Sequence, residues 1–271
     1  MCRSFIKNVI RLFFLFTIFF SSIASLSSQS VRQLGKVTYA GFIDENIFED
    51  RLVQLRKNKP STYDIVSGDA RAGLERSKKI KIELIFDQSS SYSRIVPDLS
   101  LMDGSPAAKH AMGMLKLNQG AYALQLAEKK RLRETFLLGD EANVVHVVED
   151  YNKYDWCIEE ESKVIGTYNC IKATGSLWVG TQCCGPQKRD LIAWFTLDVP
   201  LPYGPGGYDG LPGLILQLTV DHKIPVTFTA QEIILDKSTD KVPSLKKAQA
   251  IMTQEEVDIY YENLMTRKKR N

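Results

Sequence analysis

The sequence contains few of the residues that usually carry catalysis or bind metal ions. It has only 3 histidines and 5 cysteines among 271 residues. None of the histidines (His110, His146 and His222) stands four positions from another, as an H-E-x-x-H metal site requires. The sequence also lacks a G-x-S-x-G nucleophile elbow and a D-x-D-x-D-G calcium loop. We therefore predict no catalytic residue, no metal site and no cofactor.

A long, strongly hydrophobic run is missing everywhere except near the start of the chain. Residues 12–20 are apolar and uncharged, basic residues (Arg3, Lys7 and Arg11) precede them, and small or polar residues follow. This order is typical of a secretory signal peptide, and the run is shorter than the roughly 20 residues of a membrane-spanning helix. We predict a signal peptide over residues 1–28 and an exported, periplasmic or secreted protein. We predict no transmembrane segment in the remainder, residues 29–271, which we expect to form a single β-rich domain.

The predicted mature chain has no excess of either charge. The whole sequence contains 35 Lys and Arg against 32 Asp and Glu, and the first 28 residues hold three of the basic residues and no acidic one. Removal of that segment leaves 32 of each sign. A nucleic-acid-binding domain is usually basic, so we expect no nucleic-acid partner.

Four cysteines remain after the predicted cleavage: Cys157, Cys170, Cys183 and Cys184. An even number in an oxidising compartment suggests disulfides. Adjacent Cα atoms about 3.8 Å apart are too close for an unstrained bridge. We therefore expect at least one disulfide, joining Cys157 or Cys170 to the adjacent pair. The alternative for Cys170 is a small buried apolar side chain.

Hydrophobic periodicity predicts an α+β fold that is mainly β. Helical spacing occurs over residues 44–57 and 70–79, and the region 99–133 reads as helices or a long covering excursion. Alternation predicts strands at 36–42, 80–86, 89–96, 134–138, 143–149, 154–160, 164–173, 176–180, 191–198, 213–221 and 225–235. A capping box formed by Thr253 and Glu256 starts a C-terminal helix. We expect one curved antiparallel sheet of about seven to eleven strands, with the early helices covering one face.

A Gly/Pro-rich loop, residues 199–209, precedes a tight turn and a strongly apolar strand. In the turn, proline at position 212 presets φ and glycine at position 213 accepts a positive φ, which predicts a type II turn. We expect the turn to launch the strand and its apolar residues to seat the loop against the sheet. The hexapeptide consists of Gly210, Leu211, Pro212, Gly213, Leu214 and Ile215.

This hexapeptide resembles the signature of the GLPGLI family of exported proteins from Gram-negative bacteria. Other family-like motifs precede it in order: Trp156-x-Ile158, Ile165-Gly166-x-Tyr168-x-Cys170, Lys172-Ala173, Ala193-Trp194-Phe195-Thr196, Val199-Pro200-Leu201 and Gly204-Pro205. The resemblance covers about residues 156–218 and brings no established reaction or catalytic residue. Its strand pattern is similar to that of periplasmic lipoprotein carriers, which implies an open half-barrel.

Aromatic residues gather around the loop: Trp194, Phe195, Tyr203 and Tyr208. They form either ordinary core packing or a ligand pocket or partner surface. With no catalytic motif present, our leading hypothesis is a non-catalytic binding or accessory protein of the cell envelope. Its ligand would be apolar, or its partner another envelope protein. The alternatives are an extracytoplasmic hydrolase without a linear motif and a structural envelope component.

Overall fold

A computed structural model describes residues 32–270 apart from 97, 99–102, 116–119, 138–141, 180–186, 222–223 and 239. The predicted signal peptide lies outside the described residues. The sheet and the helices described below belong to one compact unit that begins at Gln33 and includes β1 from there onwards.

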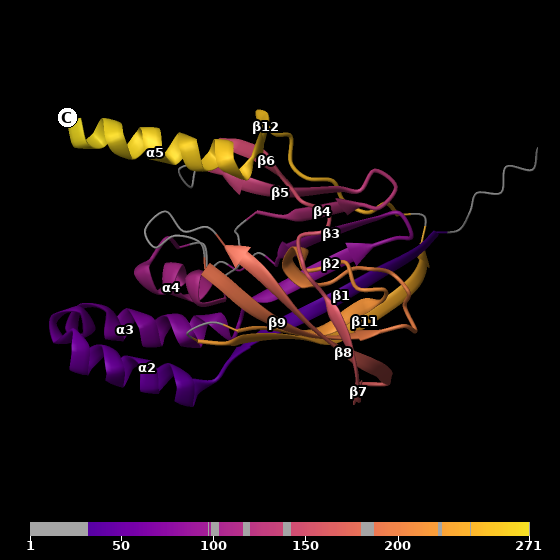
Figure 1. The fold of residues 1–271 in the computed structure, drawn as a ribbon, viewed down its shortest axis with the longest axis horizontal. Helices are drawn as coiled ribbons and strands as arrows, with labels where there is room; N and C mark the ends of the chain where they lie inside the picture. Colours follow the sequence, from indigo (N-terminus) through magenta and orange to yellow (C-terminus); the bar gives the residue numbers. More distant parts are fainter. Residues whose placement is uncertain are drawn as a thin grey trace, which may run out of the picture. The chain divides into compact units, whose positions relative to one another are not determined.

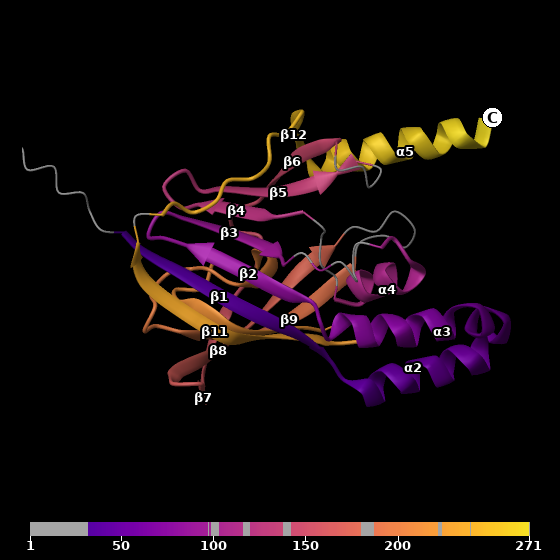
Figure 2. The same ribbon diagram turned by 180° about the vertical axis from the view of Figure 1, so that it is seen from behind.

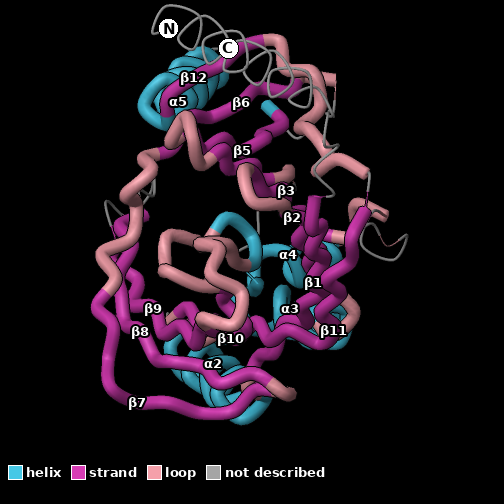
Figure 3. The backbone as a smooth tube through the Cα atoms, turned by 90° about the vertical axis from the view of Figure 1, so that its right-hand side faces the viewer, coloured by secondary structure: helices cyan, strands magenta, loops and turns pink. Residues whose placement is uncertain are grey.

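A sheet of 12 strands forms most of this unit, and its curvature is visible in Figure 3. The strands are β1 (Arg32–Ile43), β2 (Lys81–Phe86), β3 (Ser90–Ile95), β4 (Tyr122–Gln125), β5 (Lys130–Phe136), β6 (Val144–Glu149), β7 (Cys157–Ile165), β8 (Tyr168–Val179), β9 (Gln187–Thr196), β10 (Leu214–Val220), β11 (Val226–Ser238) and β12 (Ala250–Thr253). Their order across the sheet is β12-β6-β5-β4-β3-β2-β1-β11-β10-β9-β8-β7. The predicted mainly β fold with a curved, largely antiparallel sheet is therefore confirmed.

The strand order separates the sheet into two antiparallel meanders, β1–β6 and β7–β11, which meet where β1 lies beside β11. The connection from β6 to β7 must pass between opposite sides of the sheet, because β7 forms one edge and β6 lies next to the other. Residues 150–156 make this crossing, on the left of Figure 3. The crossing segment thereby bounds the open side of the curved sheet.

Alternation along the central strands buries one face of the sheet. Val37 and Tyr39 of β1 lie opposite Leu84 and Ile82 of β2, and all four are at most 1% exposed. On the opposite face, Glu83 pairs with cations of the neighbouring strands: Lys36 at 2.6 Å and Arg94 at 3.1 Å. This pattern of apolar inner and charged outer residues is that of a sheet with one dry and one wet face.

Three α-helices of the first half gather at one end of the strands, as Figures 1 and 2 show from opposite sides. They are α2 (Glu45–Asn58), α3 (Pro60–Ser77) and α4 (Pro106–Leu115). The Asp44 carboxylate caps α2 by accepting from the backbone N–H groups of Asn46 and Ile47 at 2.8 and 3.2 Å. Pro60 opens α3, where its missing N–H costs no hydrogen bond. We had expected these helices to cover a face of the sheet. The concave face is instead filled by the segment between β9 and β10.

The C-terminal helix α5 (Gln254–Arg270) begins at the predicted capping box. Thr253 Oγ1 accepts from the Glu256 N–H at 3.2 Å, and the Glu256 carboxylate accepts from the Thr253 N–H at 2.7 Å. Immediately before it, β12 pairs in parallel with β6 at an edge of the sheet. We had expected a purely antiparallel sheet of at most eleven strands, and β12 departs from both expectations.

The region 99–133 was the least well predicted part of the chain. It contains helix α4, but its second half forms β4 and most of β5. These strands are short and contain few β-branched residues, so their local propensity for strand is weak. Pairing with β3 and β6 makes them strands, since sheet formation depends on neighbours that lie far away in sequence.

Candidate functional site

The segment that carries the signature hexapeptide crosses the interior of the curved sheet, at the centre of Figure 3. Residues 197–213 leave β9, form a short 3-10 helix (Pro205–Gly207) and return to β10. On the far side, the ring of Tyr203 packs 5.5 Å from that of Phe86 in β2. The Gly206 N–H donates to Ser93 Oγ of β3 at 3.0 Å. This segment, here termed the signature loop, therefore joins the two meanders through the core.

The crossing segment 150–156 holds the signature loop from the open side of the sheet. The Tyr154 hydroxyl donates to the Gly207 carbonyl at 3.0 Å, and Trp156 Nε1 donates to the Asp209 carbonyl at 2.9 Å. The Asp209 carboxylate forms a buried ion pair with Arg131 of β5. Buried polar groups need such partners to offset their desolvation. The loop is thus anchored at both its backbone and its one buried carboxylate.

The predicted turn geometry is wrong for Gly213. Its φ is not positive, whereas Gly210 takes φ 94° and Gly206 and Gly207 take φ 60° and 81°. A Cβ atom at Gly213 would lie 2.1 Å from the Thr196 carbonyl oxygen. Glycine is needed at position 213 because the start of β10 passes close to the backbone at the end of β9. A left-handed turn is not the reason.

The four aromatic residues that we proposed as a pocket or partner surface are all buried. Phe195 and Tyr203 are at most 1% exposed, while Trp194 and Tyr208 are 9% and 7% exposed. Leu211, Leu214 and Ile215 of the hexapeptide are equally buried and belong to the same apolar core. Of these aromatic side chains, Tyr208 also lines a cavity.

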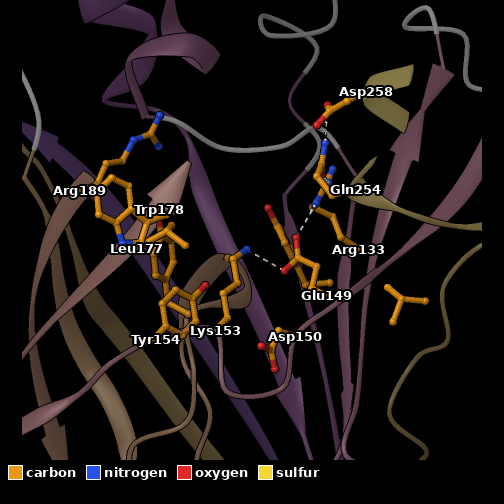
Figure 4. Close-up of a pocket in the computed structure, with 14 residues that line it drawn as sticks. Arg133, Glu149, Asp150, Lys153, Tyr154, Leu177, Trp178, Arg189, Gln254 and Asp258 are labelled. Atoms are coloured by element: carbon orange, nitrogen blue, oxygen red, sulfur yellow. Dashed lines mark hydrogen bonds and ion pairs between the residues drawn. The ribbon is translucent and has the colours of Figure 1, made fainter. Parts of the chain in front are cut away.

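That cavity, of about 490 Å³, lies beside the signature loop and is here termed the cleft. Figure 4 shows Leu177, Trp178 and Arg189 of β8 and β9 on one side, with Arg133 and Glu149 of β5 and β6 on the other. The remaining lining residues come from the crossing segment, the loop, β4, β6 and the first turns of α5: Tyr122, Val148, Asp150, Lys153, Tyr154, Gly206, Tyr208, Gln254 and Asp258. The cleft therefore has a mixed aromatic and charged lining.

One carboxylate in the cleft is held by two cations. Glu149 contacts Arg133 Nε and Lys153 Nζ, each at 2.8 Å. Burial raises the pKa of Glu149, but the ion pairs with Lys153 and Arg133 outweigh it and leave the pKa below its ordinary value. Burial lowers the pKa of Lys153, and the nearby guanidinium of Arg131 adds to this, against the opposing effect of Glu149. The two paired cations explain the direction for Glu149 and burial explains that for Lys153, and Glu149 is ionised at neutral pH.

Three tyrosines and Trp178 form the aromatic part of the lining. The rings of Tyr154 and Tyr208 stack with centroids 5.3 Å apart. Burial raises the pKa of Tyr122 and Tyr154 well above the ordinary range and that of Tyr208 to about 12. All three phenols are therefore protonated at neutral pH and act as hydrogen-bonding aromatic surfaces.

The predicted disulfides from Cys157 and Cys170 are absent, because both are free thiols. Cys183 and Cys184 lie outside the described residues. Cys170 is nine residues along β8 from Val179, a separation of about 30 Å at the usual rise per residue. The four residues that lead from Val179 to position 183 can span at most about 14 Å. Cys170 is instead a buried apolar side chain, the alternative we had considered, and burial raises the pKa of its thiol to about 11.

The histidines and acidic runs of the described residues carry no metal site. His146 Nε2 bonds to the Lys246 carbonyl oxygen at 2.9 Å, and no group of three or more His, Cys, Asp or Glu in this part of the chain could hold an ion. In the same residues, no helix has the length and apolar character needed to cross a membrane.

Sequence reasoning missed most of the cleft, since its lining residues come from five strands, one helix and two connecting segments. A signal was present in β5, where Arg131 and Arg133 alternate with Leu132. Their spacing places two guanidinium groups on one face of a strand. Only the fold shows that this face of β5 points toward the interior enclosed by the curved sheet.

Comparisons with known proteins agree with the family resemblance and with the fold. A family model described as a protein of unknown function (Porph_ging) matches residues 181–217, which confirms the resemblance over the segment that contains the hexapeptide. No curated protein matches the chain in sequence.

Solved structures provide a match in fold. Two crystal structures of PNGF-II match with TM-scores of 0.50 and 0.51 at 13% identity, over 84% of this chain. This chain spans about a third of the length of PNGF-II, 33% and 32% in the two cases. The lipoprotein LppX of Mycobacterium tuberculosis matches with a TM-score of 0.25 at 8% identity, over 78% of this chain and 88% of its own. The LppX score is too low to support an argument, and at 13% identity the likeness to PNGF-II is a likeness of fold alone.

Proposed function

We propose that this chain is a non-catalytic binding protein, and that its ligand is a small amphipathic molecule held in the cleft. The observation that carries the proposal is the cleft itself, which combines tyrosine, tryptophan and leucine side chains with charged groups. Its volume of about 490 Å³ lies in the range of sites for small molecules. The signature loop fills the sheet interior, and the cleft beside it offers a space for a ligand.

The charged lining favours an amphipathic ligand over the purely apolar one expected from the sequence. Arg133, Glu149 and Lys153 would lose hydration beneath a wholly apolar molecule without gaining new partners. Ligand pockets usually combine apolar walls with a few polar groups that orient the ligand. The cleft, with aromatic and ionic parts side by side, fits that description.

The same ionic network argues against the hydrolase alternative. Glu149, Asp150 and Asp258 line the cleft, and paired carboxylates could serve acid–base chemistry. A general acid would need a raised pKa, whereas the pKa of Glu149 is lowered and both of its oxygens contact cations. Binding is therefore the function that this geometry supports best. We also propose, from the predicted signal peptide, that the protein acts in the cell envelope.

Native mass spectrometry of the full chain, purified from the cells that produce it, tests this proposal. We expect a small molecule that leaves on mild activation. The variant Trp178→Ala should retain less of it, because Trp178 lines the cleft and is 63% exposed, so its loss should not harm the fold. The matched control is Ile158→Ala, an exposed apolar residue of edge strand β7 that does not line the cleft. Equal retention in Trp178→Ala and wild type would contradict the proposal.

A further inference from the structure

The cations that line the cleft differ in how far they are already paired. Arg133 and Lys153 both contact the Glu149 carboxylate, and Arg133 also donates to Gln254 Oε1 at 2.5 Å. Among the acidic residues of the lining, the Asp150 carboxylate accepts a hydrogen bond from the Asn152 N–H at 2.9 Å. Most of the charged lining is therefore engaged by the protein's own groups.

Arg189 is the exception within the described lining. It lies directly opposite Leu177 in the β8–β9 pair, and cross-strand partners share a face of the sheet. Leu177 is 7% exposed, so Arg189 also faces inward. Its Nε is buried and has no hydrogen-bond partner among the residues that the structure describes. Figure 4 shows its side chain across the cleft from the Glu149 cluster.

A buried guanidinium nitrogen without a partner is costly, and an anion is the group that would offset this cost most strongly. Arginine binds carboxylate and phosphate through two parallel N–H donors. The aromatic side of the cleft is adjacent, since the positive charge of Arg189 partly offsets the burial that raises the pKa of Tyr208. A guanidinium group that can bind an anion and an aromatic surface are thus available within one cavity.

We propose that the ligand of the cleft carries an anionic group, carboxylate or phosphate, that binds Arg189, and an apolar or aromatic part that packs against the cleft's aromatic lining. This inference rests on the proposed function and adds the chemical class of the ligand. Arg189 is the residue that determines specificity for charge. In the Arg133–Glu149–Lys153 network on the opposite wall, both cations are already paired with Glu149.

Isothermal titration with three probes of one shape tests the inference: 2-naphthoate, 2-naphthyl phosphate and the uncharged 2-naphthalenemethanol. We expect wild type to bind at least one anion about tenfold or more tightly than the alcohol, as a charge-assisted hydrogen bond allows. The anion with the larger advantage identifies carboxylate or phosphate as the natural group. The variant Arg189→Gln should lose this advantage while binding the alcohol unchanged.

Lys188→Gln is the matched control, because Lys188 is the adjacent strand residue, is 52% exposed and does not line the cleft. It should keep the preference for anions. Arg189→Lys retains the charge without the paired donors, so it should keep part of the preference and serves if Arg189→Gln folds poorly. If the alcohol binds wild type as tightly as both anions, or if Arg189→Gln keeps the preference, the inference is wrong and the cleft remains a binding site. If no probe binds, the proposed function itself fails.

Discussion

At the scale of single residues, the two glycines of the hexapeptide meet different physical requirements. Gly210 has φ 94°, a backbone conformation that L-residues avoid, and a Cβ atom there would meet only Trp156, at 3.8 Å. Gly213 has an ordinary φ, but a Cβ atom there would overlap the backbone of β9. A backbone atom cannot move aside as a flexible side chain can, so the second requirement is the stricter one.

Gly213→Ala should therefore destabilise the protein more than Gly210→Ala. We expect a loss of about 3 kcal/mol or more in the free energy of unfolding for Gly213→Ala, and about 1–2 kcal/mol for Gly210→Ala. Urea unfolding monitored by circular dichroism measures both. Gly68→Ala in α3 is the control, because a Cβ there has open space and alanine favours a helix. Equal losses for the two loop variants would contradict this explanation.

Asp209 is the one carboxylate that ties the signature loop to the opposite meander. Asp209→Asn would leave the guanidinium of Arg131, which is 1% exposed, without its charge partner. Removing one partner of a buried ion pair usually costs about 3–5 kcal/mol, and we expect a loss of that size in the same urea experiment.

Glu49→Gln breaks the exposed Arg71–Glu49 pair, whose two side chains are each 47% exposed. It should change stability little, because solvent screens surface pairs. A loss of stability in Asp209→Asn no larger than that in Glu49→Gln would show that the buried Arg131–Asp209 pair does not anchor the loop.

At the scale of elements, the Glu149 cluster links β5, β6 and the crossing segment, and this link depends on pH. The pKa of Glu149 is lowered in the folded protein from an ordinary value of 4.5. Its ion pairs therefore stabilise the fold at pH values above about 4.5, and this contribution is lost as the pH falls through the lower folded value.

Glu149→Gln should be less stable than wild type by about 2–3 kcal/mol at pH 7. The difference should shrink as the pH falls below about 4.5, because protonation of Glu149 in wild type breaks the same pairs. Urea unfolding at pH 7 and pH 3 gives both values. Glu161→Gln, at a 58% exposed carboxylate on β7, is the control and should show little difference at either pH. A difference that stays constant with pH would mean that the ion pairs do not hold these elements together.

Elements with strong periodicity were the ones that the sequence predicted well. The predicted strand at 80–86 and its hairpin partner correspond to β2 and β3, and the capping box starts α5 as predicted. The β7–β8 pair was predicted with its turn misplaced. The predicted strands at 154–160 and 164–173 place the turn between those ranges, whereas it falls after Ile165, where Gly166 takes φ 60°. Local spacing specifies a strand, but the turn depends on one backbone conformation that neighbouring polar residues as well as Gly166 could adopt.

At the scale of the whole sheet, sequence reasoning gave the class of fold but not what fills the interior. The apolar residues of the signature loop predicted burial, yet the partners, Phe86 and Ser93, lie more than 100 positions earlier in the chain. The cleft could not be predicted from the sequence for the same reason. Glu149 and Arg189 line the same cavity only because the chain crosses the open side of the sheet at residues 150–156. Long-range topology of this kind leaves no local pattern in a single sequence.

The central claim is that the signature loop fills the curved sheet and leaves the cleft beside it as the ligand site. A crystal structure of the protein soaked with 6-bromo-2-naphthoate tests this directly, because the anomalous signal of bromine marks the ring unambiguously. We predict one bromine peak between Tyr208 and the β8–β9 wall, with the carboxylate within hydrogen-bonding distance of Arg189 and the loop at residues 197–213 in place. A bromine peak within the sheet interior, with the loop displaced, would contradict the account, as would an empty cleft in crystals that bind the probe elsewhere.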